Sequence, residues 1–190
     1  MSRDQEPLDS TKHEEILKKK ILTAPEFTNV TQQSSPKAII LAGQPGAGKG
    51  GLKGAAKIEL QYDVVPIDPD ELRKHHPDVD TFRKAHPYTW SGDTHPDASQ
   101  WARELRNAAV DSKKNIIIDT TLGNGNSAVD MIKELQAKGY DVEVRSVVAH
   151  RLESELGVDK RFADKLNVDG YGRYVPENVH PKVSQTDSIA

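Results

Sequence analysis

The chain has 190 residues, which is enough for one well-buried domain and too few for two. Its formal net charge of −3 disfavours a nucleic-acid binder with a large basic field, and the absence of cysteine excludes disulfides, thiol catalysis and cysteine-ligated metal. The sequence shows neither the apolar core of a signal peptide nor a run of membrane-spanning length, so we expect a cytoplasmic protein without nucleic-acid or membrane partners.

Residues 1–36 are predicted to form an N-terminal helix followed by a loop. Thr11 and Glu14 have the spacing of a capping box, in which each side chain satisfies a backbone N–H at the start of a helix. Leu17 and Ile21 then stack at i, i+4 on one face of the predicted helix. Residues 23–36 are rich in Pro, Asn, Thr, Gln and Ser, which is the composition of a loop.

From residue 37 onward, strand patterns alternate with helix patterns. Strands are predicted at 37–42, 63–67, 115–119 and 142–149, and helices at 51–61, from 68, at 97–112, 127–138 and 151–166. The alternation predicts an α/β fold, a P-loop NTPase-like or kinase-like three-layer sandwich with a mostly parallel central sheet, over residues 37–182. A flexible tail is expected at 183–190. Pro66 cannot donate to a strand ladder, so it is expected on an edge strand or at the end of a strand.

A glycine-rich stretch after the first strand has the spacing of a phosphate-binding P-loop. It comprises Gly43, Gln44, Pro45, Gly46, Ala47, Gly48, Lys49, Gly50 and Gly51. Its N–H groups and the following helix N-terminus would bind the phosphates of a nucleoside triphosphate, and Lys49 would reach the β- and γ-phosphates. Gly50 stands where Ser or Thr normally holds Mg²⁺. The alternative is a glycine-rich turn with an exposed lysine.

Carboxylates follow the second and third strands, where ligands bind to parallel sheets. Asp68 and Asp70 stand two residues apart, so that one can face metal or phosphates and the other the acceptor hydroxyl. Asp119 occupies the place of a Mg²⁺-binding carboxylate, and Thr121 is a candidate substrate hydrogen bonder. The alternatives are helix capping for Asp68 and a loop-forming turn for Asp119.

Further cations come late in the chain, and histidines and tryptophans gather in its middle. Arg161 and Arg173 are candidates to clamp the γ-phosphate, against the alternative of a solvated helix face. Residues 75–96 are predicted to be irregular. The histidines in this stretch are expected to be exposed, because their spacing fits no zinc site. Trp90 and Trp101 either fill the core or form a stacking wall for a base or sugar.

The ordered motifs resemble those of the zeta toxins of bacterial epsilon/zeta toxin–antitoxin systems. They are Gly-Gln-Pro-Gly-Ala-Gly-Lys at 43–49, Ile-Asp-Pro-Asp-Glu-Leu-Arg at 67–73, His-Pro at 76–77, Ile-Ile-Asp-Thr-Thr at 117–121, Leu-Gln-Ala-Lys-Gly-Tyr at 135–140, Arg161 and Arg-Tyr-Val-Pro at 173–176. The resemblance covers about residues 37–180. In place of the family's usual residues, this chain has Gly50 for Ser or Thr and Asp119 for the frequent Glu.

The resemblance implies a toxin kinase that uses ATP and Mg²⁺ to phosphorylate the sugar 3′-hydroxyl of UDP-N-acetylglucosamine or related UDP-sugars. This reaction would deplete cell-wall precursors. By position, Lys49 matches the phosphate lysine, Asp70 the base that takes the hydroxyl proton, and Arg161 and Arg173 the phosphate-clamping arginines. Asp119 and Thr121 fall near substrate and metal, with Asp68 a further metal candidate. A small helical antitoxin is the implied protein partner.

Two other functions fit the residues. The first is a P-loop kinase for a different small-molecule hydroxyl, because the acceptor pocket is not specified by the motifs. The second is an ATP-binding interaction module without transfer activity, which the missing hydroxyl at Gly50 favours. The joint presence of Asp70, Asp119 and Arg161 favours an enzyme over the binding module.

Overall fold

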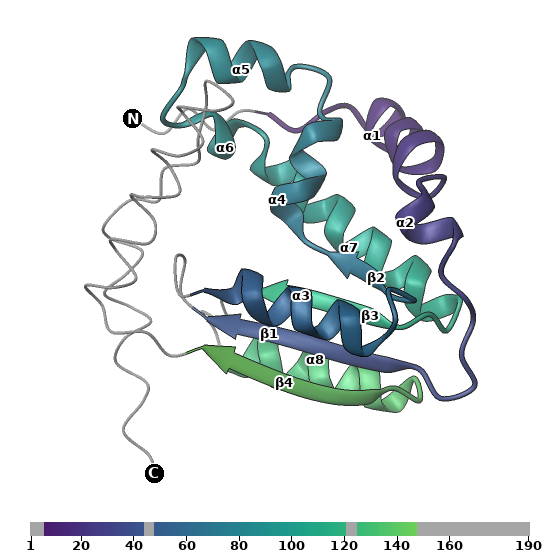
Figure 1. The fold of residues 1–190 in the computed structure, drawn as a ribbon. Helices are drawn as coiled ribbons and strands as arrows, with labels where there is room; N and C mark the ends of the chain where they lie inside the picture. The colour runs from purple at the N-terminus through teal and green to yellow at the C-terminus, as the bar shows by residue number, and fades with distance from the viewer. Residues whose placement is uncertain (1–5, 44–47, 121–124, 148–190) are drawn as a thin grey trace.

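Within residues 6–43, 48–120 and 125–147, the ranges that the computed structural model describes, four strands form one parallel sheet (Figure 1). They are β1 (Lys37–Gly43), β2 (Val65–Ile67), β3 (Ile116–Thr120) and β4 (Asp141–Val147), in the spatial order β2-β3-β1-β4. Of the two placements predicted for Pro66, the edge is confirmed, because β2 is an edge strand of this sheet. Parallel neighbours need crossover connections, and the intervening helices supply them.

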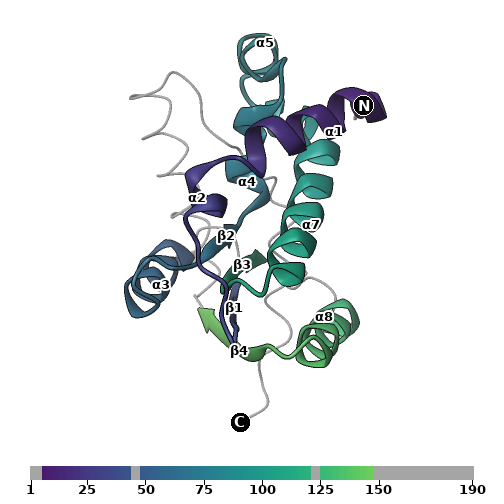
Figure 2. The ribbon, with the colours of Figure 1, turned by 90° about the vertical axis from the view of Figure 1, so that its right-hand side faces the viewer.

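Helices cover both faces of the sheet, as the three-layer prediction requires (Figure 2). On one face, Ile39, Leu41 and Ile117 pack with Ala56 of α3 (Lys49–Glu59). On the other face, Ile40 and Ile118 form part of a larger core that includes α7 (His95–Asp111) and α8 (Gly125–Ala137). Successive strand residues point to opposite faces, so the continuous apolar runs of β1 and β3 fill both cores.

The register of the sheet places the chemistry-bearing strand ends side by side. Leu41 of β1 pairs with Asp119 of β3, and Ile67 of β2 pairs with Ile118 of β3. The carboxyl ends of β1, β2 and β3 therefore lie at one edge. This is the carboxyl edge, where ligands bind in open parallel sheets.

The N-terminal segment packs onto α7. It contains α1 (Ser10–Ile16), the π-helix η1 (Leu17–Ile21) and the short α2 (Pro25–Thr28), and its Ile16 and Ile21 belong to the larger core. The predicted capping box is wrong, because the helix is capped by Asp9, whose carboxylate accepts a hydrogen bond from the Lys12 N–H at 3.0 Å. Asp is as good an N-cap as Thr, and here it begins the helix earlier.

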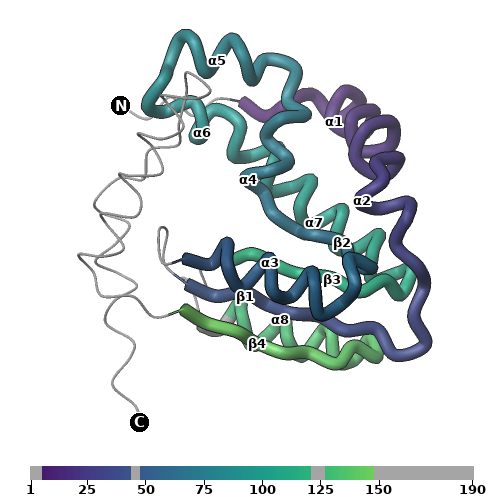
Figure 3. The backbone as a smooth tube through the Cα atoms, in the orientation of Figure 1, coloured from purple at the N-terminus to yellow at the C-terminus, as the bar shows by residue number. Residues whose placement is uncertain are grey.

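The stretch predicted to be irregular is largely helical. After α4 (Pro69–Leu72) and the 3₁₀ turn η2 (Arg73–His75), the chain forms α5 (Val79–Ala85) and α6 (Trp90–Asp93) before it returns along α7 (Figure 3). Helices this short carry no clear hydrophobic period, which is why the sequence pattern missed them. The expectation that the histidines are exposed is also wrong for His76, which is 5% exposed.

The tryptophans fill the core. Trp101 is fully buried, stacks on the ring of His13 at 5.0 Å and donates its indole N–H to the His13 carbonyl at 3.2 Å. Trp90 is buried beneath the guanidinium of Arg83. The helix predicted at 151–166 and the tail at 183–190 lie outside the described residues, and the domain boundaries stay a prediction. No helix in the described ranges is both long and apolar enough to span a membrane.

Candidate active site

The P-loop lysine is paired with the acid that follows the apolar run of β3. Lys49 begins α3, and its Nζ lies 2.8 Å from Asp119 Oδ1 and donates to the Thr120 carbonyl at 3.3 Å. The side chains of Lys49 and Asp119 are 15% and 20% exposed, so water screens the pair only partly. The β1–β3 register and the turn into α3 therefore bring together the cation and the carboxylate that the sequence assigned to phosphate and metal.

Two glycines of the loop have conformations or surroundings that other residues fit poorly. Gly48 caps α3 with φ +90°, which lies in the left-handed region. A Cβ on Gly43 would lie 3.2 Å from Lys49 Cγ and 3.1 Å from the Val147 carbonyl oxygen. Both positions therefore favour glycine, as the predicted phosphate-binding loop before α3 requires. Residues 44–47 lie outside the described ranges.

Gly50 and Gly51, in the first turn of α3, face open space, since a Cβ added at either meets nothing within 4 Å. Neither supplies an oxygen ligand from a side chain. In the part of the chain that the structure describes, no group of three or more His, Asp or Glu side chains is arranged to hold a metal ion. The protein donors available at this edge fit a Mg²⁺ ion that keeps waters and phosphate oxygens as its other ligands.

Asp68 is engaged by the protein at both of its carboxylate oxygens. One accepts the Asp70 N–H at 2.9 Å and so caps α4, and the other accepts Lys53 Nζ at 2.9 Å. Lys53 also contacts Glu71 at 3.0 Å. Burial acts to lower the pKa of Lys53, but Asp68 and Glu71 outweigh it and the pKa is raised. The capping alternative for Asp68 is present in the structure, and its role toward metal stays a prediction.

Asp70 is held by a buried arginine that sequence reasoning did not assign to the site. Arg73 is 4% exposed, and its Nε and Nη2 both donate to Asp70 Oδ1 at 3.2 Å. Its Nη1 donates to the Thr94 hydroxyl at 3.1 Å and to the Ser91 carbonyl. The Asp70 side chain remains 46% exposed. A half-exposed carboxylate on a buried, fixed cation has the geometry of a positioned base. Its sequence signals were the i, i+3 spacing from Asp70 and its place at the end of the motif at 67–73.

A cleft of about 280 Å³ opens beside these residues. It is lined by Ile67, Pro69, Ser99, Ala102, Arg103, Arg106, Ile118, Asp119, Thr120 and Met131. It adjoins Asp119 at the end of β3 and Pro69, the neighbour of Asp70, after β2. The structure therefore brings Lys49, Asp70 and Asp119 to one edge of the sheet with a cavity next to them. Thr121, Arg161 and Arg173 lie outside the described residues.

Comparison with known proteins identifies the family. The family model described as Zeta toxin matches residues 22–188. The chain belongs to the zeta toxin family. It is 28% identical over 147 residues to Toxin zeta of Enterococcus hirae, an alignment that covers 77% of this chain and 51% of that relative. This family member thus spans about half the length of that relative.

Solved structures share the fold. A chain of the PezAT chromosomal toxin–antitoxin system of Streptococcus pneumoniae is similar with a TM-score of 0.78 at 21% identity, covering 86% of this chain and 67% of that one. A chain of the AvrRxo1-ORF1:-ORF2 complex, crystallised with ATP, has a TM-score of 0.62 at 17% identity, covering 91% and 54%. The α/β class, the parallel sheet and the flanking helices predicted from the sequence are confirmed.

Proposed function

We propose that this zeta toxin family member is a kinase toxin that transfers the γ-phosphate of ATP to the 3′-hydroxyl of the amino sugar of UDP-N-acetylglucosamine or a related UDP-sugar. The observation that supports the proposal most strongly is that two ion pairs lie at the same edge of the sheet. Lys49 with Asp119 marks the phosphate side, and Asp70 with Arg73 marks the acceptor side. A protein that only binds ATP has no need of the second pair.

The residues divide the phosphoryl transfer between them. Asp70 accepts the proton of the acceptor hydroxyl as its oxygen attacks the γ-phosphorus, and the bond to the β-phosphate oxygen breaks to release ADP. Lys49 neutralises charge on the β- and γ-phosphates. Arg161 and Arg173 are proposed to stabilise the charge that spreads over the transferred group. The glycine turn at 43–51 holds the nucleotide, and Thr121 contacts the substrate.

Mg²⁺, when bound, neutralises and orients the phosphates of ATP. Asp119 is the proposed protein contributor, because its side chain stands beside Lys49 at the phosphate side and remains 20% exposed. Asp68 is the weaker candidate, because Lys53 and the Asp70 N–H already use both of its oxygens. The proposal places a small helical antitoxin on this chain in the cytoplasm. A PezAT structure, which is that of a toxin–antitoxin system, supports that partner.

The proposal is tested by measuring the release of ADP and the mass of the sugar nucleotide product. Purified protein with ATP, Mg²⁺ and UDP-N-acetylglucosamine is expected to give ADP and a sugar nucleotide heavier by one phosphate. Asp70→Asn should lower the turnover by about 100-fold or more, the scale of general base catalysis. Asp80→Asn is the matched control, because the Asp80 side chain is 81% exposed on α5, away from the cleft. Full activity of Asp70→Asn would overturn the assigned base.

The same assay separates the alternatives. A phosphorylated product from another hydroxyl compound, with none from UDP-sugars, would mean a P-loop kinase with a different acceptor. Tight ATP binding with no product from any acceptor would favour an ATP-binding interaction module, the function that the absence of a hydroxyl at Gly50 supports.

A further inference from the structure

Two arginines of α7 line the cleft beside Asp119. Arg103 and Arg106 follow Ser99 and Ala102 at i, i+3, i+4 and i+7, which is one face of a helix. All four belong to the cleft lining. Ser99 to Arg106 spans about 10 Å along the helix axis at 1.5 Å per residue. The α7 wall of the cleft, which leads away from the carboxyl edge of the sheet, therefore carries two guanidinium groups at its far end.

These guanidinium groups differ from the other cations of the site. Lys49, Lys53 and Arg73 each have a carboxylate within 3.2 Å. Arg103 and Arg106, by contrast, have no hydrogen bond or ion pair with any of the residues in 6–43, 48–120 and 125–147. Arg106 is half-buried, whereas Arg103 is exposed, so the cost of burial concerns Arg106. Partial burial of an unpaired cation costs free energy, which an anionic ligand in the cleft would offset.

Another cleft lies on the far side of Arg106. This second cleft of about 290 Å³ lies between α7 and α8 and shares Arg106 and Met131 with the first. Its other lining residues include Asn107, Lys138 and the acids Asp111 and Glu134. The carboxylates disfavour an anion at the far end. The two neighbouring clefts therefore suit a ligand whose negative charge lies at Arg103 and Arg106, between the carboxyl edge of the sheet and the second cleft.

We propose that Arg103 and Arg106 bind the diphosphate of a nucleoside-diphosphate acceptor. A guanidinium forms bidentate hydrogen bonds with phosphate oxygens, and two arginines one helical turn apart suit two adjacent phosphates. Asp119 does not repel this group strongly, because Lys49 pairs with it at 2.8 Å. The inference rests on the proposed function, since it assigns the acceptor side of that same site.

Direct binding tests the subsite without turnover. UDP is titrated calorimetrically into protein whose P-loop is saturated with a non-hydrolysable ATP analogue, so that UDP cannot report on the P-loop. We expect Arg103→Gln with Arg106→Gln to weaken UDP binding by about 10-fold or more, and Arg106→Lys to have a smaller effect, since lysine keeps the charge without the fork. Thermal unfolding of each variant reports that it is folded.

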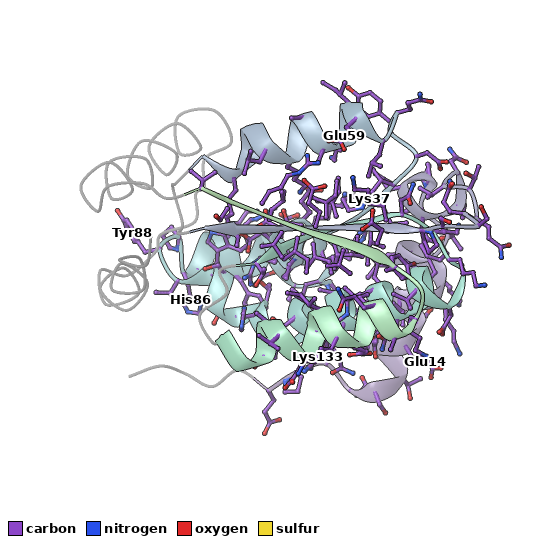
Figure 4. The ribbon with its side chains drawn as sticks, turned by 90° about the horizontal axis from the view of Figure 1, so that it is seen from below. Glu14, Lys37, Glu59, His86, Tyr88 and Lys133 are labelled. Atoms are coloured by element: carbon purple, nitrogen blue, oxygen red, sulfur yellow. The ribbon has the colours of Figure 1, made fainter. Side chains whose placement is uncertain are left out.

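Lys133→Gln is the matched control. Lys133 is an exposed residue of α8 that lines neither cleft, and Figure 4 shows it on the opposite side of the sheet from Glu59. Its loss removes one positive charge and should leave UDP binding unchanged. An equal loss of binding in this control would mean that net charge alone attracts UDP, and would overturn the subsite.

Kinetics distinguish the subsite from the reaction. If the chain turns over UDP-N-acetylglucosamine, the double arginine variant should raise the KM for that acceptor by about 10-fold and lower kcat much less. Unchanged UDP binding in the double variant, or no UDP binding by the wild type, would overturn the subsite even with active enzyme. Arginine-dependent UDP binding without phosphorylation of any UDP-sugar would support the subsite and overturn the proposed reaction.

Discussion

Lys49 Nζ lies 2.8 Å from Asp119 Oδ1, an ion pair that joins the start of α3 to the end of β3. Both partners lie at the carboxyl edge of the sheet, so the pair holds the lysine at the proposed phosphate side of the site. Lys49→Met should lower kinase turnover by about 100-fold or more, because a preorganised cation on transferring phosphate is lost. ADP release measures this, and Lys57→Met on the same helix serves as control. Similar losses in both variants would contradict a specific role for Lys49.

A hydroxyl group added at position 50 should strengthen the binding of Mg²⁺ during turnover. A Cβ at Gly50 meets nothing within 4 Å, so Gly50→Ser fits without rearrangement. One added oxygen contact of about 1 kcal/mol should lower the Mg²⁺ concentration for half-maximal turnover roughly fivefold. Gly51→Ser has the same open surroundings one residue further along and should leave the Mg²⁺ dependence unchanged. Equal shifts in the two variants would point to helix propensity and not to coordination.

Because Arg73 holds Asp70 in place, even a conservative replacement of Arg73 should lower kcat. Arg73 donates to Asp70 and to the Thr94 hydroxyl at the same time, and the single ammonium of lysine cannot reproduce this fork. We expect Arg73→Lys to lower kcat by about 10-fold with little change in the KM for ATP. Lys74→Met, at the exposed neighbouring position, controls for charge. An unchanged kcat in Arg73→Lys would mean that Asp70 needs no positioning from Arg73.

A buried cluster of hydrogen-bonded polar side chains attaches the N-terminal segment to α7. His13 contacts Asp97 at 2.9 Å and Glu104 at 2.8 Å, and Asp97 is 1% exposed. His13→Ala would leave the Asp97 carboxylate with fewer partners, at a cost of about 3 kcal/mol in the free energy of unfolding. Urea unfolding measures this cost. Lys12→Ala removes an exposed ion pair next to it and should change stability by less than about 1 kcal/mol.

An ion cluster ties β1, α3 and β4 on the α3 side of the sheet, where Figure 4 shows Lys37 and Glu59. Arg145 and then Lys37 lower the pKa of Glu143 from 4.5 to about 2. A depressed carboxylate pKa stabilises the folded state above pH 4.5, and this contribution is lost as the pH falls toward 2. The Glu143 side chain is 42% exposed, so solvent screening limits the effect to about 1 kcal/mol or less.

Glu143→Gln tests that cluster. Its free energy of unfolding should fall less steeply than that of the wild type between pH 4.5 and pH 2, and the difference should shrink in high salt. Glu134→Gln, at an exposed position of α8, should follow the wild-type curve. Parallel curves for wild type and Glu143→Gln would show that the cluster contributes nothing measurable.

The sequence alone determined the features that rest on local pattern. Apolar runs at 37–42 and 115–119 predicted buried parallel strands, and the glycine spacing at 43–51 predicted the turn into α3. Because parallel strands end at one edge, the assignment of Asp70 and Asp119 to a common site also followed from the order of the elements. The short helices α5 and α6 escaped prediction because fewer than two turns show no reliable period.

Only the tertiary structure decided which partners these residues have. Lys53 is 15 positions from Asp68, Arg73 is 21 from Thr94, and His13 is 84 from Asp97. No sequence period links residues so far apart, since their contacts depend on how helices cross the sheet. The packing of α7 on the sheet likewise places Arg103 and Arg106 in the wall of the cleft beside Asp119.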